Sequence, residues 1–154
     1  MQIIHVIGKV GAGKSWFIEK YCQNFPVFDI KSIYEEYNIS PQDIRGEKYS
    51  QFANALEITL DNFCQQYHAE EYVVIESSGI NRTINRFLLG RSHITILVES
   101  MFSLSVEFTR PYASKLNQII EKAIENGEIS VDYVFNGNSE SFTPVIPPIW
   151  CENC

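Results

Sequence analysis

IIHVIGKVGAGKS, residues 3–15, joins an apolar segment to a run of small residues that ends in a lysine and a serine. The apolar part, residues 3–7, has the composition of a strand that is buried on both faces. The glycines of the second part allow successive backbone N–H groups to curl around an anion. The helical pattern of residues 16–21 adds the positive end of a helix dipole at the same place. The run therefore predicts a strand, an anion-binding loop and a helix, in this order.

Residues 8–15 have the spacing G-x-x-x-x-G-K-[ST] of a P-loop, and they stand between a strand and a helix as that motif requires. We expect them to bind the phosphates of a purine nucleoside triphosphate, ATP with Mg²⁺. Lys14 would reach the β- and γ-phosphates, and the hydroxyl oxygen of Ser15 would be a ligand of Mg²⁺. A glycine-rich turn without a ligand is the alternative, but chance gives the motif in roughly one such chain in a few hundred. The predicted nucleotide-binding residues of the loop are Gly8, Lys9, Val10, Gly11, Ala12, Gly13, Lys14 and Ser15.

Length and charge restrict the class of protein. A chain of 154 residues, 45% of them hydrophobic, can bury a core in one domain. A formal net charge of -7 repels phosphate backbones and anionic membranes, so nucleic acid is an unfavourable partner and no membrane attachment is expected. No run approaches the ~20 apolar residues of a membrane span, and the four cysteines show no disulfide framework. We therefore expect a cytoplasmic protein with reduced thiols.

Short β-prone segments alternate with stretches of helical period along the rest of the chain, which is the pattern of a parallel sheet with covering helices. Five strands are expected, at residues 3–7, 27–28, 72–75, 94–98 and 131–135. The core-facing residues of a long helix are expected to be Phe52, Ala55, Leu56, Thr59, Phe63, Cys64 and Tyr67. Those of a later helix are expected to be Leu116, Ile119, Ile120, Ala123 and Ile124. Ser40, Pro41 and Asp43 indicate the start of a further short helix. The domain is expected to span residues 1–143, with an irregular tail at residues 144–154.

Polar residues follow several of the expected strands: Asp29 after the second, Glu76 at the end of the third, and Arg110 and Lys115 after the fourth. With the P-loop, this arrangement resembles the kinase-like branch of P-loop proteins, which includes nucleoside and nucleotide kinases, dephospho-CoA kinase, zeta toxins and polynucleotide kinase. The resemblance implies a three-layer α/β fold with helices on both faces of a five-stranded parallel sheet of order 2-3-1-4-5. It also implies transfer of the γ-phosphoryl group of ATP to a small acceptor.

The two acids are expected to lie beside the P-loop, because parallel strands end at one edge of their sheet and ligands bind there. The resemblance implies that Asp29 accepts the proton of the acceptor hydroxyl and that Glu76 holds Mg²⁺. Asp29 has an alternative role, since it could cap a helix that spans residues 30–37. For Glu76, an exposed strand end is the alternative, but a carboxylate at the end of a strongly apolar strand is costly to bury without a partner.

Cations at three places are candidates for contact with the ligands. Arg82 and Arg86 fall on the polar side of a short helix and could grip a phosphate or carboxylate of the acceptor, although solvated surface is the alternative. Arg110 lies where similar kinases carry a lid over the transferred phosphoryl group, so we assign it a catalytic role. Lys115 is a weaker candidate for the same lid. Asn136 follows the fifth strand, where family members contact adenine, and it could equally form only a turn.

The sequence thus predicts an ATP-dependent kinase that acts on a nucleoside, a nucleotide or a similar small acceptor. Ser77 stands where deoxynucleoside kinases have an arginine, so the acceptor stays open. One alternative is a kinase or NTPase that acts on nucleic-acid ends, with Arg82, Arg86 and Arg91 as a local patch. Another is a nonenzymatic nucleotide sensor whose C-terminal tail, with Trp150, contacts a protein partner.

Overall fold

The structure is a computed structural model that describes residues 1–39, 47–100, 105–107, 110–144, 148, 150 and 151, without the side chains of Lys48 and Pro111. The helix start expected at Ser40, Pro41 and Asp43 lies outside these residues. In the described part of the chain, no helix is long and apolar enough to cross a membrane.

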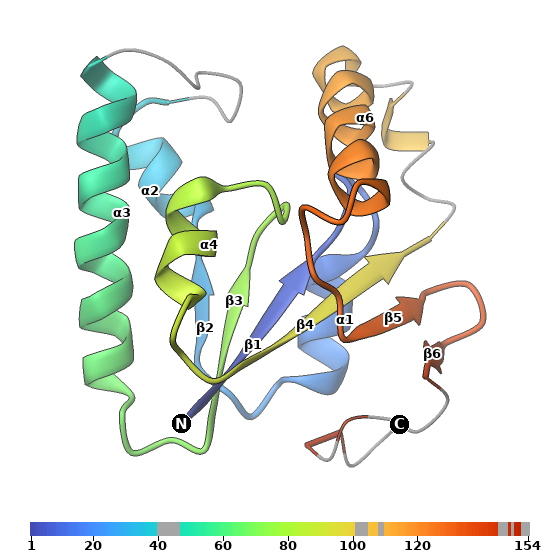
Figure 1. The fold of residues 1–154 in the computed structure, drawn as a ribbon, viewed down its shortest axis with the longest axis horizontal. Helices are drawn as coiled ribbons and strands as arrows, with labels where there is room; N and C mark the ends of the chain where they lie inside the picture. Colours follow the sequence, from blue (N-terminus) through green and yellow to red (C-terminus); the bar gives the residue numbers. More distant parts are fainter. Residues whose placement is uncertain (40–46, 101–104, 108–109, 145–147, 149, 152–154) are drawn as a thin grey trace.

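A single mostly parallel sheet forms the middle of the molecule (Figure 1). Its strands are β1 (Gln2–Ile7), β2 (Val27–Asp29), β3 (Tyr72–Glu76), β4 (His93–Glu99), β5 (Tyr133–Asn136) and β6 (Ser141–Thr143). They lie in the order β2-β3-β1-β4-β5-β6. The expected sheet of five strands in the order 2-3-1-4-5 is therefore wrong in its strand number and its full order. A sixth strand, antiparallel to β5, extends one edge, while β2-β3-β1-β4-β5 is the order of the parallel part.

Helices cover both faces of the sheet, which makes the fold three-layered. They are α1 (Lys14–Tyr21), α2 (Lys31–Glu36), α3 (Glu47–Gln66), α4 (Arg82–Leu88) and α6 (Pro111–Glu125). Figure 1 shows α3 and α4 on one face and α1 on the other. Side chains of β1 alternate between the two layers, as a strand requires: Ile3 packs with the α3 side, and Ile4 and Val6 with the α1 side.

The core on the α3 side is built on a stripe of one long helix. Phe52, Leu56 and Leu60 of α3 are fully buried, four residues apart. The expected core face named Thr59 and omitted Leu60, and this part is wrong. Thr59 is exposed, and its hydroxyl donates to the carbonyl of Ala55 at 2.7 Å. The hydroxyl thus finds a partner on its own helix, while the larger Leu60 takes the buried place.

On the other face, an aromatic cluster joins α1 to the last strands. The rings of Phe17 and Phe135 are 4.9 Å apart, and that of Phe142 in β6 lies 5.0 Å from Phe135. The tail contributes to the same core, because Trp150 and Cys151 are buried there. Cys151 is disulfide-bonded, so the expectation of reduced thiols is wrong for it, while two other cysteines, Cys22 and Cys64, are free. The division at residue 143 stays a prediction.

The later helix, α6, buries most of its predicted face: Ile120 and Ala123 are buried, and Leu116 and Ile124 are half-buried. Ile119, expected in the core, is 47% exposed. Asn117 is buried in its place, together with Ala113 and Ile120 of the same helix. The buried side of the helix therefore also includes a polar residue, which bonds the loop after β1.

Candidate functional site

The loop from Gly8 to Gly13 links the end of β1 to the start of α1, as the sequence predicts. Gly13 has a positive φ of 95° and is the N-cap residue, and its carbonyl accepts the first helical hydrogen bond, from Phe17 N, at 2.9 Å. Gly8 lies so close to β4 that a Cβ atom there would stand 2.6 Å from the carbonyl oxygen of Val98. Glycine is therefore required at this position for the loop to pass over the sheet edge. The first N–H groups of α1 have no partner within the helix and could bind an anion in the loop.

Lys14 brings a positive charge into this loop. Its Nζ donates hydrogen bonds to the carbonyl oxygens of Gly8 and Lys9, each at 2.9 Å. Burial lowers the pKa of Lys14 to about 8; the nearby Glu76 carboxylate raises it, and Lys31 lowers it further. The desolvated ammonium donates to neutral carbonyls, so an incoming anion would add to the stabilisation that the Glu76 carboxylate gives to its charged form.

Ser15 and Glu76 meet beside Lys14. Ser15 Oγ donates to Glu76 Oε1 at 3.3 Å, although the two residues lie 61 positions apart in the chain. The sheet brings them together, because Glu76 ends β3 and pairs in register with Val6 of β1. A hydroxyl and a carboxylate are hard oxygen ligands that could hold Mg²⁺. Among the described residues, no group of three or more His, Cys, Asp or Glu side chains could form a metal cage. A Mg²⁺ ion would therefore need phosphate or water oxygens as well.

A first pocket, of about 270 Å³, opens between the loop and the end of β5; we call it the Asn136 pocket. Its walls include Lys9, Ala12, Ser100 and Asn136. Asn136 Oδ1 accepts the N–H of Asn138 at 2.9 Å and so also shapes the turn after β5. Both expected readings of Asn136, as a pocket wall and as a turn residue, are compatible with this geometry.

A second pocket, of about 200 Å³, opens on the opposite side of the loop; we call it the Asp29 pocket. Its walls include Lys14, which follows the loop, and Glu76, which contacts Ser15. Its remaining walls are Val10, Asp29, Ile30, Lys31, Tyr34, Tyr49, Ser77, Ser78, Ile80, Asn81 and Leu116. The two predicted acids, Asp29 and Glu76, thus line one pocket together with the P-loop lysine.

Asp29 has a structural partner as well as a place in the pocket. Its Oδ1 accepts the backbone N–H of Lys31 at 2.9 Å, at the start of α2. This contact is an Asx-type turn bond to the first residue of α2, whose N-cap residue is Ile30, so Asp29 supports the helix start without being its N-cap. A carboxylate has two oxygens and several lone pairs, so the contact leaves Asp29 able to accept a further hydrogen bond.

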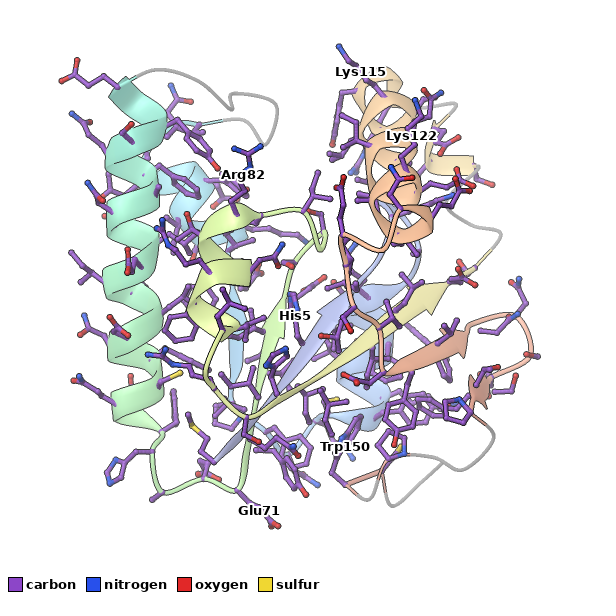
Figure 2. The ribbon with its side chains drawn as sticks, in the orientation of Figure 1. His5, Glu71, Arg82, Lys115, Lys122 and Trp150 are labelled. Carbon is purple, nitrogen blue, oxygen red and sulfur yellow. The ribbon has the colours of Figure 1, made fainter. Side chains whose placement is uncertain are left out.

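The predicted cations are less closely gathered than the acids. Arg86 pairs with Glu57 at 3.6 Å, and both side chains are largely exposed. Arg82 is exposed at the N-terminal end of α4 (Figure 2). Arg110 is exposed and precedes α6, and Lys115 extends from the N-terminal part of α6 away from the sheet in Figure 2. None of these four cations lines either pocket described above.

Two buried polar residues that contact the walls of the site were not found from the sequence. Asn117 of α6 is 1% exposed and bonds the backbone of Val10 in the loop. His5 of β1 contacts Ser77 through its Nε2, 2.7 Å from Ser77 Oγ, which in turn accepts the N–H of Gly79. Burial, with a smaller effect of His93, lowers the pKa of His5 to about 3, so the ring is neutral. A polar residue within an apolar pattern was the available signal in both cases.

Two solved structures of shikimate kinases are similar to the chain. The one from Bacteroides thetaiotaomicron has a TM-score of 0.55 and 19% sequence identity, with 88% of this chain and 86% of that chain covered. The one from Aquifex aeolicus vf5 has a TM-score of 0.51 and 19% identity, with 89% and 86% covered. At this identity the similarity shows the fold, which is the α/β fold of these kinases. A scan against protein-family models gives no match, and a search of curated proteins gives none either.

Proposed function

We propose that this protein is an ATP-dependent kinase that transfers the γ-phosphoryl group to a hydroxyl group of a small molecule. The observation that carries the proposal is the position of Lys14, which belongs to the phosphate loop and also lines the Asp29 pocket. A γ-phosphate at the Lys14 ammonium would therefore face the space where an acceptor would bind. The similar solved structures, which are named as kinases, support the same class of reaction.

The donor side of the reaction would use the groups around the loop. Backbone N–H groups at the start of α1 and the Lys14 ammonium would bind the β- and γ-phosphates. Ser15 and Glu76, whose side chains lie 3.3 Å apart, would hold Mg²⁺ directly or through water. The ion supplies charge neutralisation at the phosphates. The nucleotide would extend toward the Asn136 pocket, where Asn136 would contact the base.

On the acceptor side, Asp29 would act as the base. Its carboxylate would take the proton of the acceptor hydroxyl while the hydroxyl oxygen forms a bond to the γ-phosphorus and the bond to the β-phosphate oxygen breaks. ADP and the phosphorylated acceptor are the products. Arg110, which directly precedes α6, would stabilise the charge on the transferred group. Arg82, at the end of α4 beside the pocket residue Asn81, is better placed to contact the acceptor than Arg86, which pairs with Glu57.

The test of this proposal separates binding from transfer. ATP labelled at the γ-phosphate is incubated with a panel of sugars, hydroxy acids, nucleosides and nucleotides, and label on one acceptor is the expected result. Asp29→Asn should then lower kcat by about 100-fold or more, because the amide cannot accept the proton. Its affinity for MgATP should stay within about twofold of wild type. The matched control is Asp61→Asn, which changes an exposed carboxylate that pairs with Arg91 at 3.2 Å.

Two results would contradict the proposal. If MgATP binds and no acceptor in the panel, nor water, receives label, a nonenzymatic nucleotide sensor becomes the better account. If Asp29→Asn transfers label as fast as wild type, another residue is the base. A nucleic-acid end is a less favourable acceptor, because Arg86 and Arg91 of the suggested basic patch pair with Glu57 and Asp61.

A further inference from the structure

Hydrogen bonds of the Asn117 side chain hold α6 to the phosphate loop. Its Oδ1 accepts the backbone N–H of Val10 at 2.8 Å, and its Nδ2 lies 3.4 Å from the carbonyl of the same residue. Nδ2 also donates to Glu107 Oε1 at 2.9 Å. Glu107 belongs to a helical turn, residues 105–107, before α6. One buried amide therefore connects three segments that are separate in the sequence.

A weaker contact supports the same attachment one helical turn later. Lys9 Nζ lies 3.4 Å from Glu121 Oε2, and Glu121 follows Asn117 by four residues on α6. Both side chains of this pair are substantially exposed, so the ion pair contributes little by itself. Asn117, at 1% exposure, is the contact whose loss would leave buried polar groups without partners.

The contact between Asn117 and Val10 lies where the two pockets of the site meet. Val10 lines the Asp29 pocket, and the preceding residue, Lys9, lines the Asn136 pocket. The helix is arranged in the same way, with Leu116 at the Asp29 pocket and Ile124 at the Asn136 pocket. Figure 1 shows α6 alongside the loop that joins β1 to α1. Lys9 and Val10 therefore lie between the two pockets, and the Asn117 side chain bonds this segment through the backbone of Val10.

We propose that Asn117 is a positioning residue that holds the first part of the phosphate loop in the conformation that binds a triphosphate. The N–H of Val10 is bonded to α6, which leaves the N–H groups at the start of α1 for the phosphates. Through Glu107, the same amide ties the turn before Arg110 to the loop. This inference deepens the proposed function and rests on it for its consequence in ATP binding, whereas the contact itself can be tested without nucleotide.

A set of four proteins tests the role by loss and rescue. Asn117→Asp is isosteric and still accepts the Val10 N–H, but it places a carboxylate against Glu107 and cannot donate to it. We expect its affinity for MgATP to fall by about tenfold or more. Glu107→Gln alone is the matched control and should bind within about twofold of wild type, because its amide oxygen still accepts from Asn117. In the double variant, the introduced amide can donate to the introduced carboxylate, and the affinity should return to within about threefold of wild type.

Calorimetry with MgATP gives the four affinities, at a temperature well below the unfolding midpoint that circular dichroism measures for each protein. A purely structural role for Asn117 would change the midpoint but not the affinity of the folded protein. Asn117→Asp with wild-type affinity, or a double variant as weak as Asn117→Asp, would overturn the proposal. If Asn117→Asp does not fold, the recovery of folding without recovery of affinity in the double variant would overturn it as well.

Amide hydrogen exchange at Val10 tests the contact independently of the proposed function. Without nucleotide, this amide should be protected in wild type and should exchange at least about tenfold faster in Asn117→Ala. Fast exchange in wild type would contradict the inference even if ATP binds. Conversely, a protected amide in a protein that binds no MgATP would contradict the proposed function and not the contact.

Discussion

The pKa of Lys14 should change when a nucleotide binds. Its ammonium is held by two backbone carbonyls, and burial lowers its pKa to about 8. The bound triphosphate would stabilise the charged form and raise the pKa again. Between the two pKa values, nucleotide binding must therefore be accompanied by the uptake of a proton.

The expected result is a MgATP affinity that is nearly constant near neutral pH and falls as the pH rises above about 8, by up to about tenfold per unit. Calorimetry in buffers of different ionisation enthalpy should detect uptake of up to one proton per nucleotide at about pH 9. Lys14→Arg is the control, because its guanidinium keeps its charge throughout this range and the pH dependence should disappear. Equal affinity at about pH 7 and about pH 9.5, without proton uptake, would contradict the pKa assigned to the free protein.

At the same scale, the sequence predicted the residues of the loop and could not predict those that orient it. Lys14 and Ser15 follow from a motif whose chemistry is local, since their positions are set by the adjacent glycines and helix. Glu76 could be predicted because parallel strands end at one edge. Asn117 acts on Val10 across 107 positions of the chain, and the distance between them depends on the rotation of α6. The sequence pattern of α6 does not encode that rotation.

At the scale of the elements, the loop between β1 and α1 packs closely against β4. Ile7 of β1 pairs with Leu97 of β4, and the next residue, Gly8, lies close to the carbonyl oxygen of Val98. A methyl group on Gly8 would meet a backbone oxygen at 2.6 Å, so either the loop or the end of β4 would have to move. The loop's shape is thus set by a neighbouring strand as well as by its own sequence.

Gly8→Ala should lower both stability and nucleotide binding. We expect a loss of about 1–3 kcal/mol in the free energy of unfolding, measured in urea, because the clash is with backbone. The affinity for MgATP should fall by about tenfold. Gly90→Ala is the matched control: its φ of 77° is also positive, but a Cβ there meets nothing within 4 Å. It should cost about 1 kcal/mol of stability and leave MgATP affinity unchanged. Equal effects of the two substitutions would contradict the role given to Gly8.

The sequence predicted where the helices lie along the chain better than it predicted which of their side chains are buried. The existence of α3 and α6 follows from apolar residues at steps of three and four. In α3, however, Leu60 rather than Thr59 is buried, and in α6 Ile119 faces solvent. An apolar count chooses the most hydrophobic side of an isolated helix, whereas the folded helix must also satisfy its polar neighbours. In α6, the backbone of Val10 is such a neighbour.

For the whole molecule, the parallel part of the sheet could be predicted and the antiparallel edge could not. Strand β6 has three residues, Ser141–Thr143, in a stretch rich in polar and turn-forming residues, so it carries no strand pattern of its own. It forms because β5 offers an edge and Phe142 fits the aromatic cluster of Phe17 and Phe135. Trp150 is buried in the same core, which makes it unsuitable as an exposed anchor for a partner.

The overall charge makes the local cations of the site more important. With a formal net charge of -7, the molecule as a whole repels a nucleoside triphosphate, so the proposed binding would depend on the loop amides, Lys14 and a Mg²⁺ ion. The acceptor would enter on the other side of the same loop, into the Asp29 pocket. Its identity is the part of the function that neither the motif nor the fold specifies, because it depends on how the walls of that pocket match one small molecule.

The most direct test of a nucleotide-binding P-loop is calorimetric titration of the wild-type protein and Lys14→Ala with MgATP. The wild type should bind one nucleotide per chain. Lys14→Ala, with an unchanged circular dichroism spectrum, should bind about tenfold to a hundredfold more weakly, because it loses a charge-assisted contact to the phosphates. A folded wild-type protein that gives no binding heat at any temperature tried, or a Lys14→Ala variant that binds as tightly as wild type, would contradict this function.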